Sequence, residues 1–399
     1  MAAGVDSPAA QFGRKGVVFR VFPANYKWSL AASLVFNAAP AGGGEIGELH
    51  HVAQQLQDAA ARDDVDAWYR AWHALAERLA GLAADAMARG DALGARDCWL
   101  RACHYYQMAD RLLPPSDPRK LAAFEASLRC FEAARPLVYP PGERVEIPYE
   151  GTTLPAYYFP PLRRERERAP VVVFFDGLDV TKEICYFLAG RQLLDYGLGC
   201  LLVDGPGNGE SVRLRGLYLR PDWEVPARAA VDYLQMRPDV DPERLGILAL
   251  SLGGYYVTRA AAFEPRFRAA AAWGAQWDYH RIWLGRWRLA VDSPVSVDHH
   301  HICWVLGVDS FPAALERLQA FKLDGVAQRV TCPFLILHGA HDQQIPLRDA
   351  EALYAALGSA DKQLVVLDEP DFGDQHCQMD NAGLARYHLL GWLRARLLA

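Results

Sequence analysis

The pattern of apolar and polar positions divides the chain into two parts that meet near Pro140. Before this point, apolar residues recur at spacings of three and four, as expected on one face of a helix. The clearest run is Trp68, Trp72, Leu75, Leu79 and Leu82. We therefore predict an α-helical N-terminal cap domain over residues 1–140, with helices at 49–61, 65–88, 92–113 and 118–134. A tetratricopeptide array was the alternative, but no repeat of the right period recurs three times.

After Pro140 the periodicity changes to that of strands and helices in alternation. Glu150-Gly151 lies between two strand-like segments, 144–148 and 153–159, which predicts a hairpin. Continuous apolar runs follow at 171–175, 199–203, 245–250, 269–273, 334–337 and 363–367. Helical segments separate most of them, at 182–196, 223–236, 253–263, 347–357 and 384–397. Strands that are apolar at consecutive positions and are separated by helices predict a mostly parallel, doubly wound sheet over 141–399, which is the α/β class.

One stretch of the second part interrupts this alternation. Residues 276–330 hold four tryptophans and four histidines, and three of those histidines are consecutive. An insertion at the carboxyl edge of a parallel sheet is placed where a lid would cover a site. We expect it to act as one.

Charge and composition restrict the possible partners. The 399 residues carry a formal net charge of −6, and about half of them are apolar. This predicts a folded globular protein and gives no reason to expect nucleic acid or an anionic membrane as a partner. The basic run at 163–168 alternates with glutamates and is interpreted as a solvated loop.

The cysteines and the N-terminal region predict a cytoplasmic protein. Eight cysteines are scattered without metal-binding or redox spacing, so reduced, mostly buried thiols are expected. The apolar run at 30–38 begins too late, after several basic residues, to be a signal peptide. No apolar run approaches the roughly 20 residues needed to span a bilayer.

The strand at 245–250 runs directly into Ser251, followed by Leu252, Gly253 and Gly254. A strand that ends in a serine and small residues before a helix has the form of a nucleophile elbow. The usual first position is glycine, whereas this chain has Ala249, which is still small. Close packing of a strand against a helix would explain the glycines without catalysis.

The residues that could activate this serine follow it in the required order. The strand at 334–337 leads to Asp342, and the strand at 363–367 leads to a loop with His376. We predict His376 as the general base and Asp342 as the acid that orients it. His338 and His341 are expected to pack or to bond locally, and His388 to lie in the last helix.

The oxyanion of a tetrahedral intermediate needs two backbone donors. The N–H of Leu252 is one candidate because it directly follows the serine, and the N–H of Leu178, in the loop after the strand at 171–175, is the other by position. The aromatic residues Trp277, Trp283 and Trp304 of the insertion are candidates for binding a hydrophobic or aromatic substrate, although a small core is the simpler interpretation.

Three motifs together resemble a known family: 177–183 (GLDVTKE), 204–210 (DGPGNGE) and 251–254 (SLGG). They are similar to those of the α/β-hydrolases that include 2,6-dihydroxypseudooxynicotine hydrolase and fungal polyketide-shortening hydrolases. The resemblance implies the triad already named and hydrolysis of a carbon–carbon bond next to a carbonyl. It also implies a homodimer.

The resemblance draws attention to Asp179. The nicotine-pathway enzyme has a functionally important glutamate at this position, so a catalytic carboxylate is implied here. Capping of the helix that begins near Thr181 is the alternative.

No cofactor is expected. The cluster Asp298 to His301 could offer metal ligands, but adjacent side chains point in different directions and the triad needs no metal, so none is predicted. Two other function classes stay open. One is a carboxylesterase, thioesterase or acyltransferase, and the other is a non-catalytic interaction protein.

Overall fold

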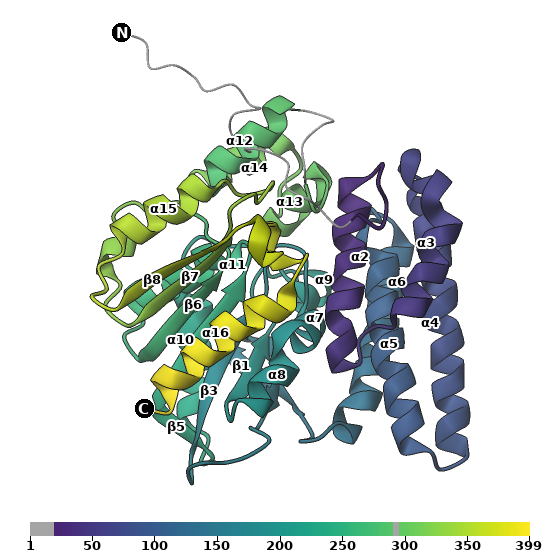
Figure 1. Ribbon diagram of the computed structural model, residues 1–399, viewed down its shortest axis with the longest axis horizontal. Helices are drawn as coiled ribbons and strands as arrows, with labels where there is room; N and C mark the ends of the chain where they lie inside the picture. Colours follow the sequence, from purple (N-terminus) through teal and green to yellow (C-terminus); the bar gives the residue numbers. More distant parts are fainter. Residues whose placement is uncertain (1–19, 290–294) are drawn as a thin grey trace.

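A computed structural model describes residues 20–289 and 295–399 of the chain. Positions 1–19 of the predicted helical domain and 290–294 of the predicted insertion lie outside the described residues. Figure 1 shows two parts side by side: a bundle formed by the N-terminal helices, and a sheet with helices on its faces.

The N-terminal part is a bundle of long helices. Four of its α-helices, α3 to α6, follow the predicted segments closely, and short 3-10 turns, η1 and η2, adjoin the bundle. The elements are α2 (Tyr26–Ala38), η1 (Ala39–Ala41), α3 (Ile46–Ala61), α4 (Val65–Ala88), α5 (Ala92–Arg111), α6 (Pro118–Ala134) and η2 (Arg135–Leu137). Asp64, Asp91 and Asp117 cap α4, α5 and α6 by accepting backbone N–H groups.

Helix α2 was not predicted from the sequence. The apolar run at 30–38 lies within a helix that Asn25 caps by accepting the N–H of Trp28 at 3.1 Å. Trp28 is buried against Phe22 and Trp68, so α2 completes the core of the bundle.

The remaining chain forms an eight-stranded sheet within the described residues, in the order β1-β2-β4-β3-β5-β6-β7-β8. In this order, each pair of neighbouring strands from β4 to β8 is parallel. Strand β2 runs antiparallel to both of its neighbours, β1 and β4. The strands are β1 (Glu143–Tyr149), β2 (Thr152–Phe159), β3 (Ala169–Phe175), β4 (Gly199–Val203), β5 (Val240–Leu250), β6 (Phe267–Trp273), β7 (Phe334–Gly339) and β8 (Lys362–Leu367). The mostly parallel sheet is confirmed. Glu150 and Gly151, both at positive φ, make the hairpin turn between β1 and β2.

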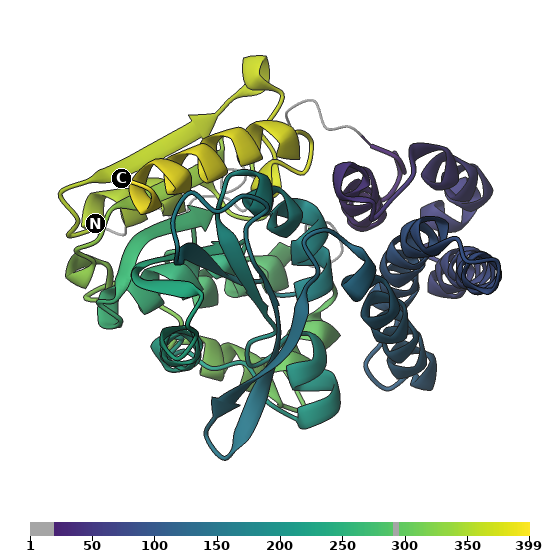
Figure 2. The same cartoon turned by 90° about the horizontal axis from the view of Figure 1, so that it is seen from below.

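Helices cover both faces of the sheet. On one face, the apolar side chains of α7 (Lys182–Cys185), the π-turn η3 (Tyr186–Gly190), α8 (Arg191–Asp195) and α16 (Ala382–Leu397) pack in one cluster with the N-terminal bundle. Figure 2 shows α16 along the sheet and the bundle beside it. The single helix predicted for 182–196 is thus interrupted by a π-turn.

The second face is covered by α10 (Glu224–Gln235), α11 (Gly253–Phe263) and α15 (Leu347–Ala356). The predicted insertion contributes α12 (Tyr279–Leu289), α13 (His299–Leu306) and α14 (Phe311–Leu318), whose apolar residues join the same cluster. The short α9 (Gly209–Arg215) follows β4, and 3-10 turns η5 (Ala327–Arg329), η6 (Glu369–Asp371) and η7 (His376–Gln378) complete the chain.

Three features bear on the predictions from composition. All eight cysteines lie within the described residues and carry free thiols. Among those same residues, no helix is long and apolar enough to cross a membrane. Residues 163–168 form an exposed loop, as predicted.

Candidate active site

Ser251 lies at a strained turn between β5 and α11. Its φ is +60°, a left-handed conformation that is unfavourable for a residue with a side chain. Its N–H donates to the carbonyl of Trp273 at 2.8 Å, which fixes the turn against β6. A Cβ on Gly254 would lie 2.2 Å from the Gly274 carbonyl oxygen, so only glycine fits there.

Ala249, the departure from the usual elbow, is accommodated by Gly253. A Cβ on Gly253 would lie only 2.4 Å from that of Ala249. The elbow therefore tolerates the larger residue at its first position because the position facing it has no side chain.

Ser251, His376 and Asp342 form a hydrogen-bonded chain. His376 Nε2 lies 2.9 Å from the Ser251 hydroxyl, and His376 Nδ1 lies 2.7 Å from Asp342 Oδ2. The N–H groups of Gln344 and Ile345 donate to Asp342 Oδ1, at 2.7 and 2.9 Å, so its carboxylate is held as the ionised form. The sequence-predicted trio thus has the distances needed to remove a proton from the serine.

Burial and the charge of Asp342 shift the pKa of His376 in opposite directions. Burial lowers its pKa, but the negative charge of Asp342 and their hydrogen bond outweigh it, so the pKa is raised above its usual range. Asp342 is only 2% exposed, whereas Ser251 is partly exposed and can meet a substrate.

A pH profile tests this electrostatic coupling. Only the neutral imidazole accepts a proton, so kcat/KM is expected to fall as the pH drops through the raised pKa of His376. Asp342→Asn removes the negative charge, so this acid limb should move to lower pH, and the plateau should fall by about 10⁴-fold. Measuring kcat/KM of a p-nitrophenyl ester against pH gives both quantities.

Asp324→Asn is the matched control, because Asp324 is exposed in the insertion. It should leave the profile unchanged. An acid limb that stays in place in Asp342→Asn would contradict the coupling.

The other histidines near these loops have local partners. The buried His338 ring lies 3.3 Å from the N–H of Ala275 and 3.1 Å from the Ile345 carbonyl, and His341 pairs with Asp374 at 2.8 Å. His388 lies in α16.

The loop after β3 passes directly beside the nucleophile. A Cβ on Gly177 would lie 3.2 Å from the Cβ of Ser251. The carbonyl of Gly177 accepts a hydrogen bond from Asn208, and in a trans peptide the next N–H, that of Leu178, points the opposite way. Leu252 is the N-cap residue of α11. Both predicted oxyanion donors are thus on segments that flank Ser251, and their role stays a prediction.

His301 holds the same loop from the insertion. Its Nε2 lies 3.1 Å from the Leu178 carbonyl. Burial and the charge of Lys120 lower the pKa of His301 to about 4, so the ring is neutral at physiological pH and donates through Nε2. Two residues of the Asp298 to His301 cluster thus have local partners: His301 contacts the loop, and Asp298 pairs with Lys27 of α2 at 3.1 Å.

Asp179 pairs with the N-terminal bundle. Arg111 of α5 binds its carboxylate and donates to its backbone carbonyl at 2.9 Å. The alternative in which Asp179 caps the next helix is wrong, because Thr181 is the cap and accepts the N–H of Ile184. A catalytic role for Asp179 stays a prediction.

Comparison with known proteins identifies the family. The family model described as Esterase FrsA-like matches residues 80–290, and the family model of the prolyl oligopeptidase family matches residues 205–396. A hydrolase from Fusarium sp. named LUC6 is 32% identical, over 94% of this chain and 97% of its own. This chain belongs to the FrsA-like family of α/β-hydrolases. The resemblance seen in the three motifs is confirmed.

Two further proteins match this chain along most of their length. The 20-hydroxy-prefusarin hydrolase FUS2 of Gibberella moniliformis (strain M3125 / FGSC 7600) is 30% identical over 90% of this chain and 94% of its own. The crystal structure of the 2,6-dihydroxy-pseudo-oxynicotine hydrolase matches with a TM-score of 0.77 and 26% identity, over 91% and 96% of the two chains. The likeness therefore extends over the helical bundle as well as the hydrolase part.

The three candidate substrate tryptophans of this FrsA-like hydrolase lie in different surroundings. Trp283 is buried in the core between Tyr279 and Phe311. Trp277 is partly buried, and its backbone N–H donates to Asp349 at 3.3 Å. Trp304 instead faces the bundle, where Lys120 of α6 lies 5.7 Å from its ring, and Arg213 of α9 lies 5.1 Å from the same ring. They form no single aromatic wall.

Trp304 stands near a polar cavity between the bundle and the hydrolase part. Asp179, His301 and basic side chains from both parts line it; the basic ones are Arg111, Lys120 and Arg213. Arg111 and Asn208 were not singled out from the sequence. Their partners come from segments far apart in the chain, so spacing gives no signal for them.

Proposed function

We propose that this chain is a serine hydrolase that cleaves a carbon–carbon bond next to a carbonyl in an aromatic or polyketide-like ketone. The hydrogen-bonded chain from Ser251 through His376 to Asp342 carries the proposal of a serine hydrolase. The choice of bond is supported by the family resemblance and by relatives named for prefusarin and pseudo-oxynicotine substrates.

In the first half of the reaction, the Ser251 hydroxyl attacks the ketone carbonyl while His376 takes its proton. The N–H groups of Leu252 and Leu178 then stabilise the oxyanion. When the tetrahedral intermediate collapses, the bond to the neighbouring carbon breaks and leaves an acyl-enzyme. The departing carbanion is delocalised onto an adjacent carbonyl or phenol and accepts the proton from His376.

In the second half, water replaces the leaving group. His376 removes a proton from the water, whose oxygen attacks the acyl-enzyme and releases a carboxylic acid and the free serine. The need to stabilise the carbanion restricts good substrates to 1,3-diketones and acylphenols. We also propose that Asp179, on the same loop as Leu178, holds the keto or enol form of such a substrate.

Ester or thioester hydrolysis, or acyl transfer, is the second candidate function. The same nucleophile and oxyanion donors serve any acyl transfer, and the matching family model is described as that of an esterase.

A matched panel of three substrates separates these functions. We expect an aryl 1,3-diketone to be cleaved to a carboxylic acid and a methyl ketone. The corresponding monoketone should be inert because its leaving carbanion has no second carbonyl, and the corresponding benzoate ester reports general esterase activity. Products are followed by liquid chromatography and mass spectrometry. Turnover of the ester with no cleavage of diketones would refute the carbon–carbon proposal and leave the esterase.

The homodimer that the resemblance implies also remains a proposal, which sedimentation velocity of the purified full chain would test.

A further inference from the structure

Arg286 is a buried positive charge without an acidic partner. It lies in α12 and is only 7% exposed. Among the residues that the structure describes, no carboxylate oxygen lies within 4 Å of its guanidinium, and its Nε has no hydrogen-bond partner. Its Nη2 makes only long contacts, of 3.4 and 3.5 Å, to the carbonyl and side-chain oxygens of Gln344. Such a charge is costly to bury unless something compensates it.

Aromatic side chains lie near this guanidinium. It stacks 4.7 Å from the ring centroid of Trp283, one turn earlier in α12. Tyr279, in the first turn of the same helix, is buried, and burial raises its pKa to about 12 even though Arg286 opposes the shift. Tyr26 comes from α2 of the bundle, and burial together with the charge of Asp342 raises its pKa. Both phenols are therefore neutral hydrogen-bond donors at physiological pH.

The guanidinium lies beside the catalytic loops. Gln344, which it contacts, donates its backbone N–H to Asp342 at 2.7 Å, and Asp342 in turn holds His376. Burial lowers the pKa of Arg286, while Tyr279, Tyr26, Asp342 and Asp179 act in the opposite direction. Asp342 orients His376, and Asp179 lies on the loop after β3, which passes beside Ser251, so the charge of Arg286 lies near both of these loops.

We propose that Arg286 binds a negatively charged oxygen of the substrate, with Tyr26 and Tyr279 as neighbouring donors. This rests on the proposed function and narrows its substrate class to acidic ketones. The charged oxygen is that of a carboxylate substituent or that of an ionised 1,3-diketone, the enolate. A guanidinium offers several donors in a planar fork, which suits either group. Because Tyr26 belongs to α2, the bundle contributes directly to substrate recognition.

Binding measured by calorimetry tests this without depending on which bond is cleaved. The full-length Ser251→Ala protein is used, so that no probe is turned over. One pair of probes is 4-phenylbutyrate and 4-phenylbutyramide, which differ by the charge. The other pair is an aryl 1,3-diketone, above the pH at which it ionises, and its 2,2-dimethyl analogue, which forms no enolate. We expect at least one charged member to bind about tenfold more tightly than its neutral partner. The pair that shows the preference identifies the source of the charge.

Adding Arg286→Met should reduce that preference to less than about threefold, whereas Arg286→Lys, which keeps the charge, should retain part of it. The control is Arg288→Met, on the exposed side of the same helix, which should keep the full preference. Melting curves show whether each variant is folded. If Arg286→Met does not fold, the test is whether Arg286→Lys reduces the preference for the charged probe. Equal binding of charged and neutral probes in both pairs, or a preference that survives in Arg286→Met, would overturn the proposal. Neither outcome bears on whether diketones or esters are hydrolysed.

Discussion

Ser251→Ala is expected to lower turnover by about 10⁶-fold, since removal of the nucleophile of a serine triad has an effect of this size. Of the three hydrogen-bonded residues Ser251, His376 and Asp342, the Ser251 hydroxyl is the one that forms the acyl-enzyme. Alanine leaves His376 without a proton to accept. Alanine is smaller than serine and keeps the turn, so the fold should be preserved. The remaining rate reflects the oxyanion donors and substrate binding alone.

The loss is measured as kcat/KM on the best substrate of the panel, and labelling of the protein by a fluorophosphonate is measured by intact mass. The wild-type protein should gain one label on Ser251, and the variant should gain none. Ser116→Ala, at an exposed turn between α5 and α6, is the matched control and should retain full activity. Activity that survives in Ser251→Ala, with wild-type carry-over excluded by mass spectrometry, would show that a water activated by His376 attacks the substrate directly.

The sequence was sufficient to predict the triad because its signals are local. Each catalytic residue lies in the turn or loop that follows a parallel strand, and the carboxyl ends of neighbouring parallel strands meet at one edge of the sheet. Ser251 after β5, Asp342 after β7 and His376 after β8 therefore converge, and chain order alone assigns them. The four helices α3 to α6 and the hairpin were predicted for the same reason, since periodicity and turn residues are read within a short window.

What could not be predicted depends on contacts between distant segments. Helix α2 was missed because its residues are apolar on most sides, so it lacks the amphipathic pattern of a surface helix. The ion pair of Arg111 with Asp179 joins residues 68 positions apart. The unpaired state of Arg286 is a property of its surroundings, and no spacing in the sequence reveals it.

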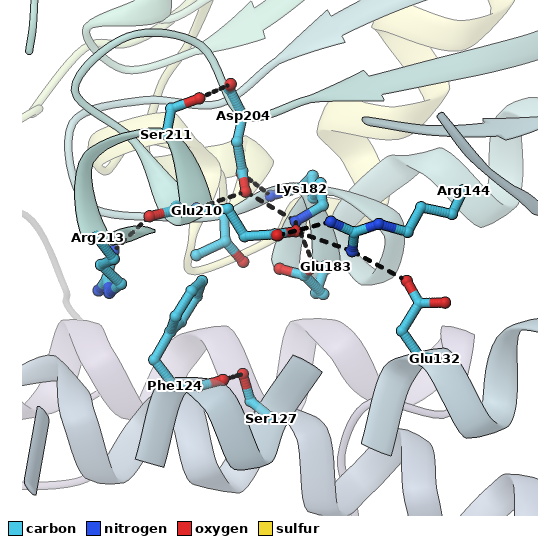
Figure 3. Close-up of polar contacts among 12 residues, drawn as sticks. Phe124, Ser127, Glu132, Arg144, Lys182, Glu183, Asp204, Glu210, Ser211 and Arg213 are labelled. Atoms are coloured by element: carbon cyan, nitrogen blue, oxygen red, sulfur yellow. Dashed lines mark hydrogen bonds and ion pairs between the residues drawn. The ribbon is translucent and has the colours of Figure 1, made fainter. Parts of the chain in front are cut away.

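A buried cluster of charges beneath the oxyanion loop gives the second large prediction. Lys182 begins α7 with no exposed side-chain surface, and its ammonium lies 2.8 Å from Glu183, 2.8 Å from Asp204 and 2.6 Å from Glu210. Figure 3 shows these side chains around the lysine, with Arg144 on the other side of Glu210. Asp204 also accepts the backbone N–H groups of Lys182 and Glu210, at 2.8 and 2.9 Å. The cluster thus fixes the start of α7 and the turn after β4.

The carboxylates in this cluster depend on the lysine. Burial raises the pKa of Glu183, and the charge of Lys182 opposes this shift. Burial also acts to raise the pKa of Glu210, but Lys182 and Arg144 lower it to about 2. Without the lysine, Glu210 would keep its pair with Arg144, whereas Glu183 and Asp204 would lose their ion pair with Lys182, and one or more of these buried carboxylates would have to take up a proton or draw in water.

Lys182→Met is therefore expected to lower the free energy of unfolding by about 3–5 kcal/mol, the usual result of removing one partner from a buried ion cluster. Methionine keeps the length and apolar stem of the side chain, so the loss reports mainly the charge. It is measured by urea denaturation followed by far-UV circular dichroism. Lys322→Met is the matched control, because Lys322 is about half exposed and lies 3.9 Å from Asp278, a pair that should contribute less than about 1 kcal/mol.

The same substitution should also reduce activity, because α7 anchors the loop that carries Leu178 and Asp179. Glu183 links this anchor to the bundle through Gln107 of α5 at 3.1 Å, so loosening α7 disturbs the site from both sides. We expect kcat to fall more than KM rises in folded Lys182→Met, since a misplaced oxyanion donor weakens the transition state more than the bound substrate. Equal losses of stability in Lys182→Met and Lys322→Met would show instead that the buried carboxylates are already protonated and that the cluster does not hold the loop.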